Sequence, residues 1–208
     1  MHQPLDDSLV PATKRTLIIG ANGQIARVVT RLLLNRLDVE IHLFLRGARR
    51  LAVLADHPRI RLIEGDATDR DALDRAMQGM ETVYANLSGD MERQARAIVD
   101  AMREAGVGRL VFTSSMGIYG EAAGQSSGTV LDPYRRSAEV VEGSGLDYTV
   151  VRPARLNDDN EIAYGTTRRH QPFLNPDAYV SRKSVADLVI RALLDGTGSR
   201  DSLGVHRT

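Results

Sequence analysis

Cysteine is absent from the 208-residue sequence, which excludes disulfide bonds, thiolate metal sites and catalysis by a thiol. The 5 histidines are scattered without the spacing of metal ligands, so we expect no metal site. Lysine plus arginine and aspartate plus glutamate both total 27. The resulting net charge of zero provides no field to hold nucleic acid or an anionic membrane, and we expect a small-molecule substrate instead.

Long apolar runs are also missing. No stretch approaches the ~20 apolar residues that span a bilayer, and residues 1–13 lack the apolar centre of a signal peptide. We therefore expect a cytoplasmic protein in which residues 1–13 form a flexible tail. Hydrophobic residues make up 42% of the sequence, and the length corresponds to one domain over residues 14–208.

Short apolar runs alternate with helical patterns along the chain. Runs rich in β-branched residues predict strands at 16–19, 40–45, 60–63, 82–85, 109–113 and 148–151. Between them, apolar residues recur at spacings of three and four, as on the buried face of a helix. A last helix is predicted from Ser181, a suitable N-cap. This alternation indicates a Rossmann-type doubly wound α/β fold, a single domain with a parallel sheet in the strand order 3-2-1-4-5-6.

Two glycines, Gly20 and Gly23, separate the first predicted strand from the first helix. In dinucleotide-binding proteins such a turn directs backbone N–H groups at the pyrophosphate from the helix N-terminus. We expect Asn22, Gln24 and Ile25 to share that contact with the two glycines. The spacing differs from G-x-G-x-x-G, and the alternative is an ordinary turn that uses glycine for its positive φ.

The second predicted strand is followed by Arg46, where an NAD-binding site usually carries an acidic residue that accepts the ribose 2′-hydroxyl. A guanidinium makes charge-assisted hydrogen bonds to a 2′-phosphate, whereas a carboxylate repels it. The sequence therefore predicts that NADP(H) is preferred over NAD(H). The alternative is a solvated basic loop, and this interpretation is stronger for Arg49 and Arg50 than for Arg46.

Together with the segments 65–68, 86–89, 111–120 and 145–153, these residues resemble an atypical short-chain dehydrogenase/reductase. The chain is most similar to the small NAD(P)H-binding group with NmrA-like and biliverdin-reductase-B-like members, over residues 14–195. The resemblance implies that Asp66 and Ala67 contact the adenine and that Leu87 and Ser88 follow the ribose. It also implies that Thr113 and Ser114 flank the nicotinamide ribose and that Pro153, Ala154 and Arg155 contact the nicotinamide.

The same resemblance assigns catalysis to a tyrosine, to a lysine four residues later and to a serine that orients the substrate carbonyl. Ser115 and Tyr134 match the serine and the tyrosine, but Ala138 stands at the lysine position. Residues i and i+4 share one face of a helix, so Arg135 and Arg136 do not replace that lysine. A phenol without a neighbouring cation stays protonated at neutral pH and acts as a hydrogen-bond donor. Ser115 and Tyr134 then position an acceptor, or both are structural.

Two functions follow. In the first, the protein reduces a small carbonyl, quinone or flavin-type acceptor by hydride transfer from NADP(H). In the second, it is a non-catalytic regulatory protein that senses NADP(H), which the missing lysine favours. We expect it to act alone or as a homodimer.

Residues 155–180 lack periodic apolar positions and contain glycine, prolines and acidic residues. We expect a small lid here, with a short strand near 162–167, whose order over 157–179 depends on ligand. Arg168 and Arg169 within it bind an anionic group of cofactor or substrate, or form a solvated pair.

Overall fold

The computed structural model describes residues 13–36, 38–121 and 130–208. The predicted tail falls almost entirely on residues 1–12, outside this part of the chain. The predicted strands are present, with small differences at their ends, and they are parallel and in the predicted order. The doubly wound fold is therefore confirmed. In sequence the strands are β1 (Lys14–Ile19), β2 (Val39–Leu45), β3 (Ile60–Glu64), β4 (Thr82–Ala85), β5 (Arg109–Thr113) and β6 (Asp147–Pro153).

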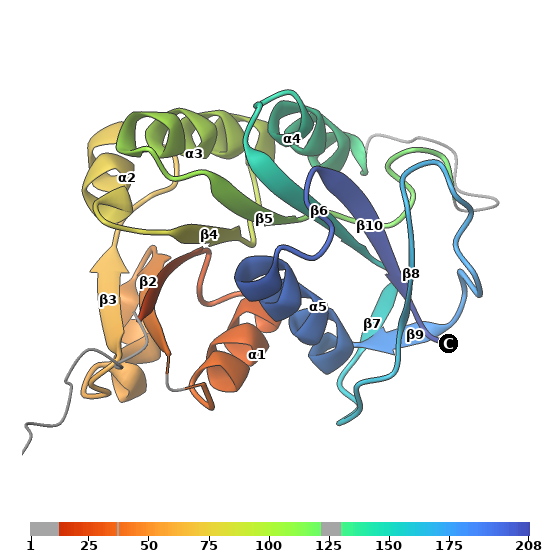
Figure 1. Cartoon of the computed structure of the whole chain (residues 1–208), viewed down its shortest axis with the longest axis horizontal. Helices are drawn as coiled ribbons and strands as arrows, with labels where there is room; N and C mark the ends of the chain where they lie inside the picture. Colours follow the sequence, from red (N-terminus) through yellow and green to blue (C-terminus); the bar gives the residue numbers. More distant parts are fainter. Residues whose placement is uncertain (1–12, 37, 122–129) are drawn as a thin grey trace, which may run out of the picture.

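Two more strands extend the sheet beyond β6. β10 (Asp201–His206) lies parallel to β6, and β8 (Gly165–Thr167) pairs antiparallel with β10 (Figure 1). Gly204 in β10 leaves room for Phe173, because a Cβ atom there would lie 2.4 Å from the ring. We did not predict β10, since its sequence contains Asp, Ser, Gly and His rather than a continuous apolar run.

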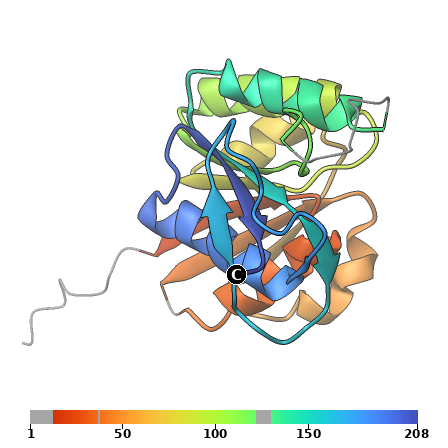
Figure 2. The same cartoon turned by 90° about the vertical axis from the view of Figure 1, so that its right-hand side faces the viewer.

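Five helices cover the two faces of the sheet in the described part of the chain. α1 (Gln24–Leu33) and α5 (Arg182–Asp195) pack on one face, and α2 (Arg70–Met77), α3 (Met91–Ala105) and α4 (Asp132–Glu142) pack on the other (Figures 1 and 2). Each face buries its own apolar cluster. The predicted N-cap is confirmed, since the Ser181 hydroxyl accepts a hydrogen bond from the Ser184 N–H at 2.9 Å.

A short 3-10 helix, Ala48–Leu54, follows β2 in the basic segment, for which a solvated loop was one of the two interpretations. No described helix is long and apolar enough to cross a membrane.

The predicted lid segment is more ordered in its secondary structure than we expected. β7 (Arg155–Asn157) pairs with β9 (Tyr179–Ser181) in a separate two-stranded sheet, and the short strand predicted near 162–167 is β8. The segment is also tied to α5: the Ser181 hydroxyl donates to the Glu161 carbonyl at 2.7 Å, and the Tyr164 hydroxyl donates to Asp187 at 2.7 Å. Its dependence on ligand stays a prediction.

Candidate functional site

The carboxyl ends of β1 to β4 surround a cleft of about 290 Å³. The register sets Ile19 at the end of β1 opposite Phe44 of β2 on one side and Ala85 of β4 on the other, so the residues that follow these strands meet at one edge of the sheet. Much of the predicted cofactor-binding set lines this cleft: Gly20, Asn22, Gly23, Arg46, Asp66, Ala67, Leu87 and Ser88.

The glycine turn is packed tightly against the end of β4. Gly20 has a φ of +76°, and a Cβ atom there would lie 2.1 Å from the carbonyl oxygen of Asn86. A Cβ atom on Gly23 would lie 2.0 Å from Nδ2 of Asn86. We expected Gly23 to admit a pyrophosphate to the backbone, and its missing side chain also makes room for Asn86.

The first turn of α1 offers backbone N–H groups to the cleft. Gly23 is its N-cap, and no side chain from the described residues caps this end of the helix. The leading N–H groups of a helix have no partner within the helix, so they can bind an anion. The side chains of Gln24 and Ile25 are directed elsewhere, because Oε1 of Gln24 accepts a hydrogen bond from Arg182 at 3.0 Å and Ile25 is buried. Both can contribute only through the backbone.

Charged side chains of opposite sign lie next to each other after the ends of β2 and β3. Nη1 of Arg46 lies 3.8 Å from Oδ2 of Asp66, and both side chains are partly exposed. Oδ1 of Asp66 accepts hydrogen bonds from the backbone N–H and the hydroxyl of Thr68, both at 2.8 Å. These bonds, with a smaller contribution from the Arg46 charge, hold the pKa of Asp66 below its ordinary value. Asp66 is therefore an ionised acceptor at neutral pH, and Arg50 adds a second cation to the lining.

Residues predicted to lie near the nicotinamide end are at the ends of β5 and β6, outside the lining of this cleft as the structure describes it. Their polar groups are used within the protein. The Thr113 hydroxyl shares a hydrogen bond of 2.9 Å with the Tyr84 hydroxyl, and the Ser114 hydroxyl donates to the Tyr134 carbonyl at 3.2 Å.

The predicted residues at the end of β6, Pro153 to Arg155, contact neighbouring segments of the chain. The Pro153 carbonyl accepts from the Met116 N–H at 3.1 Å, and the Ala154 N–H donates to the Val205 carbonyl at 2.9 Å. Arg155 is about half exposed, and its guanidinium lies 3.6 Å from Asp177 in the predicted lid. These contacts place the three predicted residues beside the lid segment.

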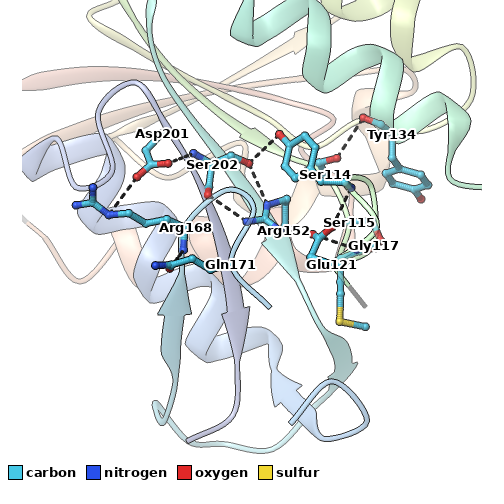
Figure 3. A network of polar contacts seen from close by, with 12 residues as sticks. Ser114, Ser115, Gly117, Glu121, Tyr134, Arg152, Arg168, Gln171, Asp201 and Ser202 are labelled. Atoms are coloured by element: carbon cyan, nitrogen blue, oxygen red, sulfur yellow. Dashed lines mark hydrogen bonds and ion pairs between the residues drawn. The ribbon is translucent and has the colours of Figure 1, made fainter. Parts of the chain in front are cut away.

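The two candidate catalytic residues lie on elements that touch each other. Figure 3 shows the Ser114 hydroxyl directed at the Tyr134 carbonyl, which joins the end of β5 to the first turn of α4. The Ser115 hydroxyl donates to the carbonyl of Met116 at 3.2 Å. Tyr134 packs at the edge of the apolar cluster in which Ala138 is completely buried, so the lysine position faces the protein core.

A buried ion pair lies behind this region. Arg152 of β6 contacts Glu121, and both side chains are almost fully buried. The Arg152 guanidinium also donates to the hydroxyl of Ser202 in β10 at 3.0 Å. Figure 3 shows Arg152 between Ser202 and Glu121. Glu121 in turn accepts hydrogen bonds from the backbone N–H groups of Gly117 and Tyr119. The pair thus connects two strands with the loop that carries Ser115.

The two lid arginines bind carboxylates of this chain. Arg168 lies 3.5 Å from Asp201, and Arg169 lies 3.1 Å from Glu142. Arg169 also stacks on the ring of Tyr119, with 4.7 Å between its guanidinium carbon and the ring centroid. They are therefore neither an isolated solvated pair nor directed at the cleft.

The lining of the cleft fits a dinucleotide. The uncapped turn of α1 suits the pyrophosphate, Asp66 supplies an acceptor, and the arginines supply positive charge at the end of β2. A family of proteins described as NAD(P)H-binding matches residues 20–196. The chain belongs to this NAD(P)H-binding family.

Solved structures support the assignment. A Rossmann-fold NAD(P)-binding family protein from Shigella flexneri is 37% identical, with a TM-score of 0.81 over 94% of each chain. A short-chain dehydrogenase/reductase from Veillonella parvula, solved in complex with NADP, is 26% identical, with a TM-score of 0.84 over 93% of this chain and 94% of that one. The resemblance to atypical short-chain dehydrogenases/reductases is thereby confirmed.

One curated relative is a reductase. The (4-alkanoyl-5-oxo-2,5-dihydrofuran-3-yl)methyl phosphate reductase of Streptomyces griseus is 29% identical over 188 residues. That alignment covers 88% of this chain and 64% of the relative, so the chain spans less than two thirds of the relative's length. This NAD(P)H-binding protein is thus similar to a reductase over most of its own length.

Three lining residues with polar side chains were not among those we predicted to bind the cofactor: Arg50, Asn86 and Gln94. Arg50 lies four residues after Arg46, and the 3-10 helix brings it back to the cleft. Gln94 follows the apolar spacing of Met91, Ala95 and Ile98 on the buried face of α3. A polar residue on an apolar face is the signal that could have found it.

Proposed function

We propose that this NAD(P)H-binding protein is a reductase that prefers NADP(H) and transfers hydride to a small carbonyl, quinone or flavin-type acceptor. The preference rests on Arg46 and Arg50, which line the cleft together where an NAD site usually has an acid. The side chain of Arg46 is 72% exposed, so it can turn towards a phosphate without leaving a core contact. Two guanidinium groups favour a 2′-phosphate over a hydroxyl.

The reductase activity is supported by the Streptomyces griseus relative, which is named a reductase. The cofactor supplies a hydride from its nicotinamide ring. Ser115 follows the end of β5, and the backbone carbonyl of Tyr134 contacts the neighbouring Ser114. We assign the hydroxyls of Ser115 and Tyr134 to holding the acceptor by hydrogen bonds. Ala138 provides no cation to promote rapid proton transfer by Tyr134.

A sensor of NADP(H) is the second candidate. The observation that favours it is the complete burial of Ala138, which leaves the usual catalytic lysine without a counterpart at that position. The Thr113 and Ser114 hydroxyls are also engaged within the protein. Such a protein binds nucleotide and transmits its state to a partner without turnover.

Calorimetric titration with NADPH and NADH tests the cofactor preference. We expect tighter binding of NADPH, and Arg46→Ala should weaken it by about tenfold while NADH binding changes little, because a charge-assisted hydrogen bond is lost. Arg61→Ala is the matched control, since Arg61 of β3 is equally exposed but pairs with Glu40 of β2. Equal affinity for the two nucleotides in the wild-type protein would contradict the preference.

Oxidation of NADPH with quinones, flavins and aldehydes tests the reductase activity. We expect turnover with at least one acceptor class and slower turnover in Ser115→Ala and Tyr134→Phe. Tight NADPH binding with no turnover across the panel would favour the sensor.

A further inference from the structure

Gln94 has a buried side-chain atom without a partner. The residue is only 8% exposed and lines the cleft. Its Oε1 atom is one of three buried side-chain atoms that lack a hydrogen-bond partner among the described residues, the others being Thr167 Oγ1 and His206 Nε2. Those two belong to the β8 and β10 pair, whereas Gln94 Oε1 belongs to the nucleotide cleft.

The orientation of this amide is fixed by its other end. Nε2 of Gln94 donates a hydrogen bond to the carbonyl oxygen of Ser88 at 3.1 Å. A carbonyl oxygen can only accept, so the nitrogen must face Ser88 and the oxygen must face away from it. The lone acceptor is thus set by the protein before any ligand arrives.

An apolar side chain would suit this helix position better if no ligand contacted it. Gln94 occupies the buried face of α3 with Met91, Ala95 and Ile98. Burying an amide oxygen without a hydrogen bond is unfavourable, whereas a methionine or leucine would pack there without that penalty. The position therefore points to a ligand group that donates a hydrogen bond to Gln94.

The chemistry of the dinucleotide limits which group this is. Phosphate oxygens are acceptors and cannot serve Oε1, so the donors available are the ribose hydroxyls, the carboxamide of the nicotinamide and the exocyclic amine of adenine. Gln94 lines the cleft together with Ser88, whose carbonyl it contacts, and with Asp66 and Ala67 at the end of β3. Arg93, the residue before Gln94, is close enough to Asp66 for its charge to help lower the pKa of that carboxyl. The start of α3 therefore lies near Asp66.

We infer that Gln94 reads the base of the nucleotide. Its Oε1 accepts one hydrogen of the exocyclic amine of adenine, while Asp66 accepts the other. The two acceptors together select a 6-aminopurine over a 6-oxopurine, because an oxo group brings a third acceptor against them. This inference rests on nucleotide binding in the cleft and holds for a reductase and for a sensor alike.

The test compares NADPH with its hypoxanthine analogue, in which an oxo group replaces the amine. Both are titrated calorimetrically into the wild-type protein, Gln94→Met and Gln94→Glu. The methionine keeps the volume but removes the acceptor, and we expect NADPH to bind about fivefold more weakly while the hypoxanthine analogue binds equally well or better. The glutamate keeps an acceptor towards the base but sets its second oxygen against the Ser88 carbonyl, so we expect weaker binding of NADPH with the preference for the amino base retained.

The control is Gln78→Met, the same substitution at an exposed site at the end of α2. Equal weakening of both nucleotides in Gln94→Met would show that Gln94 only supports the cleft, and this would overturn the inference. An unchanged ratio of the two affinities in all variants would also overturn it. Failure of NADPH to bind the wild-type protein would instead count against the proposed function.

Discussion

At the scale of single residues, Arg152 and Glu121 form the most deeply buried ion pair of the described chain. Burial removes both charges from water, and each then depends on the other for compensation. Arg152 is further enclosed by the rings of Tyr119 and Phe173, with 5.0 and 5.4 Å to their centroids. The pair therefore links the loop after β5 to the lid segment that carries Phe173.

We expect Glu121→Gln to lower the free energy of unfolding by about 3 kcal/mol, because it leaves the buried Arg152 charge without a counter-ion. Gly117 and Tyr119 donate to different carboxylate oxygens of Glu121, so the amide oxygen can accept from only one of them and the loss includes one hydrogen bond as well as the charge. Urea unfolding followed by circular dichroism measures it.

The matched comparison is the double variant Glu121→Gln with Arg152→Met. It should cost clearly less than the sum of the two single variants, since neither charge is then left alone. Strictly additive losses would show that the two charges do not depend on each other.

The sequence predicted those lining residues whose positions depend on a local motif. Gly20, Arg46 and Asp66 each follow a strand end, and a parallel sheet brings such ends together. Gln94 and Arg50 could not be placed in the same way. Their positions depend on how α3 and the 3-10 helix fold back over the sheet, which no local spacing encodes.

At the scale of elements, strands with continuous apolar runs were predictable because the sheet buries them on both faces. β10 is equally buried, yet Ser202 and His206 occupy two of its buried positions. The Ser202 hydroxyl is paired with Arg152, which compensates for its burial. Such compensation comes from distant residues, so the sequence of β10 alone gives no sign of a central strand.

The lid is an element whose behaviour can be measured. Its two ends are fixed by the pairing of β7 with β9, whereas Arg168 is 77% exposed and Leu174 is 61% exposed. We expect backbone amides over 157–163 and 168–178 to exchange with deuterium faster than those of β1 to β6, and to slow when NADPH and an acceptor are added.

The amides of β1 to β6 are the internal reference for that experiment. The lid hypothesis is wrong if the segment is as protected as these strands in the free protein and the ligands leave it unchanged. The pocket would then be preformed.

At the scale of the whole molecule, spatial order and chain order differ at one side of the sheet. β10 follows all other strands in sequence but lies between β6 and β8. Within the described sheet β8 pairs with β10 alone. The hydrogen bonds between β8 and the sheet therefore cannot form until residues 201–206 have joined it.

This arrangement has a consequence for folding kinetics. Pairing β10 with β6 closes a loop of about fifty residues, and the entropic cost of such closure slows non-local pairing. We expect pulse-labelled hydrogen exchange during refolding to show protection first in β1, β4 and β5, then in β10, and in β8 no earlier than in β10. Protection of β8 before β10 would mean that the lid segment finds its place without the last strand. Otherwise the side of the protein that carries the lid is assembled last.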